Sequence, residues 1–291
     1  MPKVNISIER ITSLEEFVNN KSIPSDEIHL TWIGQAGFMF KFKDKLIMID
    51  PYLSDYLSKK YKGKLFPHIR LMEIPILPEK IVNVDYILSS HAHSDHMDPE
   101  TLTILSDNNQ GCKFIVPAAE IEEAINRGVK RHQITPANNQ KSIFLEEKIK
   151  IIGIAASHED LKVNEKGEFH YLGFVFDLGG IKIYHSGDCI PYEGLYEKLK
   201  DFNIDLALLP INGRDEYRLS NNIAGNFKIT EVLEICQKTG IKNLIVHHFG
   251  MFAYNTVSYD ELKKLKKESS KSSKALRIIV PEINVVYKIR K

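Results

Sequence analysis

A cluster of metal-binding residue types follows a largely apolar run in the first third of the chain. Residues 91–96 have the pattern H-x-H-x-D-H, and the preceding run Val84–Ser89 predicts a strand that ends just before it. Side chains two residues apart in an extended segment point the same way, so the H-x-H pair suits one ion. A turn after the pair would bring the aspartate and the last histidine to a second ion, about 3.5–4 Å from the first. The predicted ligands in this segment are His91, His93, Asp95 and His96.

Further apolar runs end in side chains that would complete such a site. Two ions of this kind need about six or seven protein ligands, which is more than residues 91–96 supply. Runs that predict strands end shortly before His158, Asp188 and His248, and Gly187 permits the tight turn that would let Asp188 bridge both ions. We therefore predict one ion held by His91, His93 and His158, another held by Asp95, His96 and His248, and Asp188 between them.

Two more histidines stand close to these ligands in the sequence. Strand alternation would send His247 and His248 to opposite sides, and Gly250 follows the second more closely, so His248 is favoured as the ligand. His247 then lies behind the ligands or in the core. His185, which precedes Asp188 by three residues, is predicted to support a ligand from behind rather than to bind an ion.

Strand-like and helix-like segments indicate a mixed α/β protein. The first half opens with runs at 29–33, 38–42 and 46–51 that predict consecutive antiparallel strands. After the histidine cluster, Asp98 followed by Pro99 predicts the start of a helix, which places the cluster in a strand-to-helix loop. Strands and helices then alternate, and the second half repeats the rhythm. We predict a single domain, 1–291, built of two similar halves. The segment from Leu53 to about Pro78 predicts a long surface excursion, whose function is open.

The composition excludes several kinds of partner. Lys and Arg total 39 and Asp and Glu total 38, so no overall field attracts nucleic acid or an anionic membrane, and we expect neither as a partner. No run approaches the length of a membrane span, and the N-terminal residues lack the apolar core of a signal peptide, which predicts a cytoplasmic protein. The expected partner is a small-molecule substrate. A homo-oligomer is left open.

A polar cluster after a buried strand supplies candidates for substrate binding. Arg214 and Arg218 suit a phosphate or carboxylate, because a guanidinium offers a planar fork to such groups. Asn212 and Asn255 are further candidates for the same cleft. The alternative is a surface loop with a local ion pair, such as Arg214 with Asp215.

The ordered set of H-x-H-x-D-H, a histidine, S-G-D and a last histidine resembles the metallo-β-lactamase superfamily. Within it, residues 32–38, 49–51, 184–188 and 209–215 look most like the branch of the L-ascorbate-6-phosphate lactonases. Residues 248–252 are similar to the closing motif of N-acyl-phosphatidylethanolamine phospholipase D. The resemblance implies an α/β fold, a four-layer αβ/βα sandwich with a dimetal site on one edge. It also implies that Asp50 orients metal-site histidines; a simple Asp-Pro turn at the strand end is the alternative.

The resulting hypothesis is a dinuclear metal-dependent hydrolase that uses a metal-bridged hydroxide. Asp95 is the predicted catalytic residue, which orients the nucleophile and carries its proton to the leaving group. The preferred reaction is that of a lactonase on a small phosphorylated or acidic sugar derivative. A phosphodiesterase with the same site is the first alternative, and a non-catalytic metal-binding or regulatory protein is the second. Histidine-rich sites with a bridging carboxylate accept zinc, manganese or iron, and the resemblance favours manganese slightly over zinc.

Overall fold

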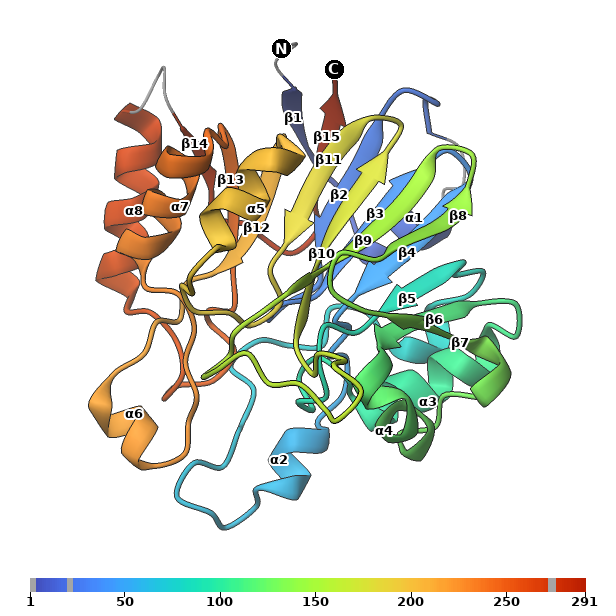
Figure 1. Ribbon diagram of the computed structural model, residues 1–291, viewed down its shortest axis with the longest axis horizontal. Helices are drawn as coiled ribbons and strands as arrows, with labels where there is room; N and C mark the ends of the chain where they lie inside the picture. The colour runs from blue at the N-terminus through green and yellow to red at the C-terminus, as the bar shows by residue number, and fades with distance from the viewer. Residues whose placement is uncertain (1–3, 20–22, 272–275) are drawn as a thin grey trace. The chain divides into compact units, whose positions relative to one another are not determined.

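The chain divides into two compact units. The computed structural model describes residues 4–19, 23–271 and 276–291. Unit 1 is formed by Met1–Asn138, Val163–His170 and Glu282–Lys291, and unit 2 by Asn139–Lys162 and Tyr171–Pro281. Each unit contains one mixed β-sheet with its own helices (Figure 1). The single domain proposed from the sequence stays a prediction.

Unit 1 is built on an eight-stranded sheet in the order β1-β15-β2-β3-β4-β5-β6-β7. Neighbours from β1 to β4 are antiparallel, as predicted for the first strands, and neighbours from β4 to β7 are parallel. Because parallel strands end at the same edge, the loops that follow β4 and β5 are brought together there. The strands are β1 (Asn5–Arg10), β2 (Ile28–Trp32), β3 (Phe38–Phe42), β4 (Lys45–Ile49), β5 (Tyr86–Leu88), β6 (Lys113–Pro117), β7 (Ile134–Ala137) and β15 (Val285–Arg290).

Helix α3 of unit 1 starts where the sequence predicts. The Asp98 carboxylate accepts a hydrogen bond from the backbone N–H of Glu100, and Pro99 is the first helical residue. Leu102 and Leu105 of this helix belong to the hydrophobic core of the unit, which fixes the helix that follows the histidine loop. The helices of unit 1 are α1 (Leu14–Asn19), α2 (Tyr56–Lys60), α3 (Pro99–Asn108) and α4 (Ile121–Asn126), with 3₁₀ turns η1 (Pro78–Lys80), η2 (Ala118–Glu120) and η3 (Arg131–Gln133).

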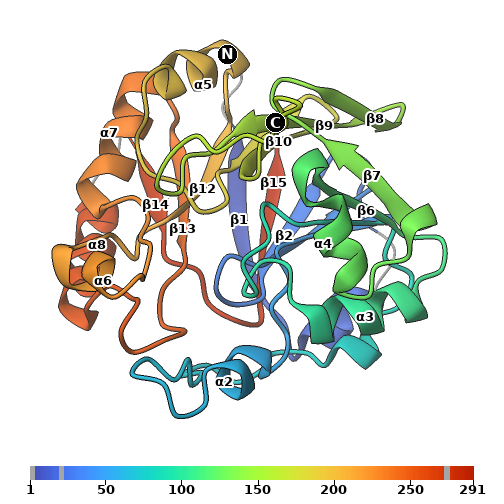
Figure 2. The same cartoon turned by 60° about the horizontal axis from the view of Figure 1, so that its bottom comes forward.

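Unit 2 is built on a seven-stranded sheet in the order β14-β13-β12-β11-β10-β9-β8. The strands from β11 to β14 are parallel and those from β8 to β11 antiparallel. They are β8 (Ser142–Glu146), β9 (Ile149–Ala155), β10 (Leu172–Leu178), β11 (Ile181–His185), β12 (Leu206–Pro210), β13 (Asn243–His247) and β14 (Arg277–Ile279). Helices α5 (Leu195–Phe202), α7 (Ile229–Thr239) and α8 (Tyr259–Lys271) lie along the parallel strands (Figure 2), and α6 (Glu216–Ser220) is a short helix in the loop after β12.

The long connection between β4 and β5 contains two short elements that the sequence did not predict, helix α2 and the 3₁₀ turn η1. Helix α2 lies in it, followed by an irregular stretch whose side chains include the exposed Leu65 and Ile69. The prediction of a surface excursion is confirmed, and the segment returns to the sheet through the buried Ile81.

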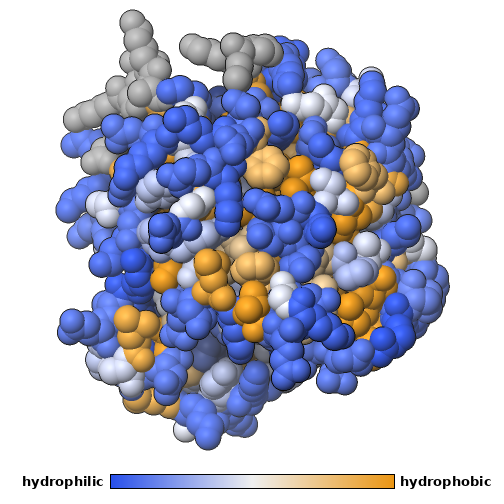
Figure 3. Space-filling view, viewed as in Figure 1, coloured by the Kyte–Doolittle hydropathy of each residue, from blue (hydrophilic) through white to orange (hydrophobic). Residues whose placement is uncertain are grey.

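The surface drawn in Figure 3 is mainly hydrophilic, with hydrophobic residues in small separate patches. Among the described residues, no helix combines the length and the apolar character that a membrane crossing requires.

Candidate metal centre

In unit 1, the predicted ligands of the H-x-H-x-D-H segment lie together in the loop between β5 and α3. The ring centroids of His91 and His96 are 4.1 Å apart, and those of His91 and His93 are 4.7 Å apart. His91 and His96 are buried, whereas His93 is exposed. The folded loop therefore gathers three imidazoles that are close neighbours in sequence.

Asp50 fixes the orientation of the His96 ring through a hydrogen bond to its Nδ1. Asp50 is the residue after β4, it is fully buried, and its Oδ2 accepts a hydrogen bond from His96 Nδ1 at 2.7 Å. A neutral imidazole that donates through Nδ1 carries its lone pair on Nε2. Because the carboxylate holds the tautomer in this way, Nε2 of His96 is the atom prepared for a metal ion.

Ser90 extends the same arrangement to His91. Its backbone N–H donates to Asp50 Oδ1 and its hydroxyl donates to Asp50 Oδ2, both at 2.7 Å. A hydroxyl has one proton, so the contact of 3.0 Å between Ser90 Oγ and His91 Nδ1 requires His91 to be the donor. His91 therefore also presents its lone pair through Nε2. Sequence reasoning assigned no role to Ser90, although it directly precedes the motif.

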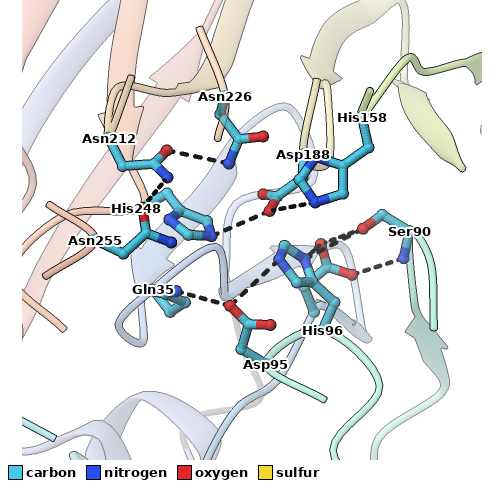
Figure 4. Close-up of polar contacts among 12 residues, drawn as sticks. Gln35, Ser90, Asp95, His96, His158, Asp188, Asn212, Asn226, His248 and Asn255 are labelled. Atoms are coloured by element: carbon cyan, nitrogen blue, oxygen red, sulfur yellow. Dashed lines mark hydrogen bonds and ion pairs between the residues drawn. The ribbon is translucent and has the colours of Figure 1, made fainter. Parts of the chain in front are cut away.

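Gln35 is a second residue that supports a predicted ligand through a hydrogen bond. Its Nε2 donates to Asp95 Oδ2 at 2.8 Å (Figure 4), and the side chain is fully buried in the turn between β2 and β3. Gln35 has a φ of 49°, in the left-handed region that costs energy for a residue other than glycine. The same Asp95 oxygen lies 3.7 Å from His96 Nε2. Gln35 thus holds the Asp95 carboxylate on the side of His96 Nε2.

In unit 2, three ligand candidates come from the ends of three strands. His158 follows β9, Asp188 follows β11 and His248 follows β13, as the sequence predicts. Asp188 Oδ2 lies 3.8 Å from His158 Nε2 and 3.2 Å from His248 Nε2. Figure 4 shows the carboxylate between the two rings. All three side chains are buried.

These separations suit donors that share ions. Two donors bound to one zinc ion at 2.0–2.1 Å with tetrahedral geometry are about 3.3 Å apart. The distances of 3.2 and 3.8 Å from Asp188 to the two rings, and of 3.7 Å from Asp95 to His96, fall near this value. Imidazole nitrogen and carboxylate oxygen are also the donor types that such ions prefer. The candidate metal-binding side chains are His91, His93, Asp95 and His96 in unit 1, and His158, Asp188 and His248 in unit 2.

The two other predicted histidines pair with each other. The rings of His185 and His247 stack with centroids 4.7 Å apart, and both are fully buried in unit 2. His185 Nδ1 accepts the backbone N–H of Gly187, in the turn that carries Asp188. Neither histidine belongs to a candidate metal-binding group of the described residues. The ring pair thus contacts the turn that leads to Asp188, and His247 directly precedes His248 in the sequence.

The predicted substrate-binding arginines are engaged by carboxylates of unit 2. Arg214 forms a bidentate ion pair with Glu231, with both N···O distances 2.7 Å. The carboxylate partner of Arg214 is therefore Glu231 and not Asp215. Arg218 instead pairs with Asp215 at the start of α6. Their role in substrate binding stays a prediction, and each guanidinium has an internal partner that would compete with a substrate.

Asn212 and Asn255 form a partly buried amide network with Arg218. Asn255 Oδ1 accepts hydrogen bonds from Asn212 Nδ2 at 2.8 Å and from Arg218 Nη1 at 2.9 Å. The Asn212 Oδ1 in turn accepts from Asn226 Nδ2 at 3.1 Å (Figure 4). Two donors on one oxygen fix the orientation of the Asn255 amide, so its Nδ2 is directed away from Asn212 and Arg218.

Comparisons with known proteins identify the family of this chain. The model of the family described as the β-lactamase superfamily domain matches residues 46–249. A UPF0173 metal-dependent hydrolase of Saccharolobus solfataricus is 29% identical over 201 residues, which are 67% of this chain and 77% of that protein. The match to the family model begins at the second residue of β4 and ends just after His248, so it spans the whole predicted ligand set.

Solved structures show the same fold. A metallo hydrolase of Ignicoccus hospitalis superimposes with a TM-score of 0.63 at 20% identity, covering 90% of this chain and 98% of that one. The metallo-β-lactamase fold protein YhfI of Bacillus subtilis gives 0.60 at 17% identity, covering 90% and 100%. The predicted α/β fold of the metallo-β-lactamase type is therefore confirmed.

Proposed function

The chain belongs to the β-lactamase superfamily and is a metal-dependent hydrolase, and we propose that it is a dinuclear lactonase acting on a small phosphorylated or acidic sugar derivative. The observation that carries this proposal is the orientation of His96 by Asp50, because an imidazole with its Nδ1 bound to a buried carboxylate is prepared to bind metal through Nε2. Neighbouring donors at ligand spacing in both units support it.

The proposal assigns the predicted ligands to two ions. As predicted from the sequence, His91, His93 and His158 would hold one ion, Asp95, His96 and His248 the other, and Asp188 would lie between them. The hydrogen bonds of Asp50 and Ser90 support the use of Nε2 in His91 and His96. Zinc and manganese both accept this mixture of nitrogen and oxygen donors, and iron is the third candidate.

The roles of the protein groups follow from their contacts. Bound ions of this kind lower the pKa of a water toward about 7 and polarise the oxygen that is attacked. Asp95, with Oδ2 held by Gln35, would accept the proton of the attacking water. Opening a lactone breaks the bond between the carbonyl carbon and the ring oxygen, and Asp95 would return the proton to that oxygen. The product is the corresponding hydroxy acid.

The substrate class rests on weaker support than the reaction type. The resemblance of residues 32–38, 49–51 and 184–188 to the sugar-phosphate lactonases favours this branch. The half-buried amide of Asn255 suits a hydroxyl or carbonyl oxygen of a sugar derivative. A phosphodiesterase would use the same ions and the same Asp95, and a non-catalytic protein would keep the ions without turnover.

An activity panel separates these alternatives. The metal-loaded protein is assayed against sugar-phosphate lactones, bis-(p-nitrophenyl) phosphate and thioesters, together with Asp95→Ala and His96→Ala. We expect hydrolysis of a lactone, with loss of at least a hundredfold in both variants, since each removes a group of the reacting site. Hydrolysis of the phosphodiester alone would establish the phosphodiesterase instead. If the metal-loaded protein turns over none of these substrates, the remaining hypothesis is a non-catalytic metal-binding protein.

The chain offers matched controls for these two variants. His132 and Asp107 are exposed residues outside the candidate ligand set. His132→Ala and Asp107→Ala remove the same chemical groups from the surface of unit 1, so they should retain the activity of the original protein. A similar loss in these controls would show that the assay reports general damage.

A further inference from the structure

Helix α2 of unit 1 ends in a lysine that contacts the metal-binding loop. Lys60 Nζ donates a hydrogen bond to Ser94 Oγ at 3.3 Å. Ser94 lies between His93 and Asp95 in the sequence and is 6% exposed. The ammonium group is therefore held against the segment that supplies four of the predicted ligands.

The neighbouring lysine has a different environment. Lys59 Nζ lies 2.8 Å from both carboxylate oxygens of Glu100, which neutralise its charge. Lys60 lies near the rings of Tyr56 and Tyr61, at 5.8 and 5.5 Å from their centroids, and within the described parts of the chain it forms no ion pair with a carboxylate. An ammonium has three N–H donors, and Ser94 accepts one of them. The other donors and the positive charge remain for an anion.

The segment after α2 places two stacked aromatic rings, those of Tyr61 and His68, close to the Lys60 ammonium. The rings of Tyr61 and His68 stack with centroids 4.1 Å apart at 22°. His68 has a φ of 45°, and its Nδ1 is 2.7 Å from the carbonyl oxygen of Phe66. Burial lowers the pKa of His68, against a smaller opposing effect of the Asp95 charge and with a small further lowering by Lys60. Lys60 and Asp95 are therefore each close enough to His68 to act on its charge.

We infer that Lys60 binds the anionic group of the substrate, a phosphate monoester or a carboxylate, beside Asp95. This inference rests on the proposed hydrolase and deepens it, since it assigns the acidic substituent to a definite cation. The sequence proposed Arg214 and Arg218 for that role, but Glu231 and Asp215 bind those guanidinium groups. Lys60 has its charge available, and it contacts Ser94, the residue that directly precedes the proposed proton acceptor Asp95.

A set of related substrates tests this assignment. Three lactones with the same ring are compared: one phosphorylated, one carrying a carboxylate and one neutral. Lys60→Met should lower the ratio of kcat/KM for an anionic lactone to that for the neutral lactone about tenfold to a hundredfold, as expected for a hydrogen bond to a charged group. Whichever anionic lactone loses its advantage identifies the natural substituent. An unchanged ratio for both would overturn the inference.

Lys59→Met is the matched control. It removes an exposed lysine from the adjacent position of the same helix. The ion pair that Lys59 forms with Glu100 is exposed to solvent. The original ratio should be retained in Lys59→Met and largely restored in Lys60→Arg, which keeps the charge. A loss in Lys59→Met as large as that in Lys60→Met would show a general effect of surface charge and would overturn the assignment.

A binding measurement separates this inference from the proposed reaction. If no lactone is hydrolysed, the lactonase proposal fails, and the metal-loaded protein is titrated with inorganic phosphate by calorimetry. Phosphate bound directly by the ions contributes equally to the original protein, Lys59→Met and Lys60→Met. A dissociation constant at least several-fold higher in Lys60→Met alone supports the anion site. Equal constants in the three proteins would overturn it.

Discussion

Asp50 and His96 form a hydrogen bond of 2.7 Å between two side chains that are both fully buried. They are 46 positions apart in the sequence, and the parallel pairing of β4 with β5 brings the ends of their strands together. The bond holds His96 in one tautomer and directs Nε2 to the site where an ion is expected.

Replacing Asp50 by Asn should weaken metal binding. The amide keeps the shape of the carboxylate but removes its charge, so it no longer matches three donors from His96 and Ser90. We expect the dissociation constant of the metal to rise about tenfold to a hundredfold, measured by competition with a chromophoric chelator. Asp44→Asn in the exposed hairpin turn is the control and should bind as the original protein does. Equal affinity in Asp50→Asn would contradict this role.

Replacing Ser90 by Ala should have a smaller effect on the same measurement. The hydroxyl transmits the orientation from Asp50 to His91, whereas the backbone N–H of residue 90 still donates to Asp50. Loss of one neutral hydrogen bond corresponds to about 1 kcal/mol, or about a fivefold rise in the dissociation constant. The exposed hydroxyl of Ser58 provides the control Ser58→Ala. A loss as large as that of Asp50→Asn would mean that the hydroxyl does more than orient His91.

Replacing Asn255 by Ala should raise KM more than it lowers kcat. The amide oxygen is bound by Asn212 and Arg218, so the NH₂ group is the part available to a substrate oxygen. A donor that contacts the substrate equally in the ground state and the transition state changes KM alone, here by about fivefold to tenfold. Steady-state kinetics of Asn255→Ala are compared with those of Asn221→Ala, whose side chain bonds within α6. A drop in kcat at constant KM would instead assign the amide to the transition state.

The pair of Arg214 with Glu231 should stabilise unit 2 in a pH-dependent way. Burial raises the pKa of Glu231, but the hydrogen bonds from Arg214 and from the Lys228 backbone outweigh burial and hold the pKa below the usual glutamate value of 4.5. A carboxyl with a lowered pKa in the folded state stabilises the protein above the pKa of the unfolded state. This stabilisation is lost as the pH falls through the folded value.

Urea unfolding at a series of pH values checks this effect. The difference in unfolding free energy between the original protein and Glu231→Gln should be present at pH 7 and shrink as the pH falls below 4.5. Glu234→Gln, which removes a surface partner of Lys238, should show a smaller difference at all pH values. A difference for Glu231→Gln that does not change with pH would contradict the linkage.

The sequence predicted those features of the fold that depend on local pattern. Strand β3 has the predicted bounds, 38–42, because its apolar residues and flanking turns are contiguous. The start of α3 follows from Asp98 and Pro99 alone. In contrast, β1 and β15 were not predicted, since they pair across almost the whole chain, from Asn5 to Arg290, and no local pattern records a partner.

The candidate ligands were predictable for the same reason, and their supporting residues were not. A histidine or aspartate after an apolar strand is visible in the sequence, whereas the bonds of Gln35 to Asp95 and of Ser90 to Asp50 join residues 60 and 40 positions apart. The partners of the arginines were equally hidden. Arg214 pairs with Glu231 on α7 rather than with its neighbour Asp215, because the helix brings that carboxylate to it.

Metal analysis tests the central claim most directly. The purified protein is dialysed against zinc or manganese, its metal content per chain is measured by mass spectrometry, and hydrolysis is followed before and after removal of the metal with a chelator. We expect about two ions per chain, loss of at least one in His96→Ala, and hydrolysis that disappears with the metal and returns when it is restored. A chain that binds no metal, or hydrolysis that persists after the metal is removed, would contradict the account.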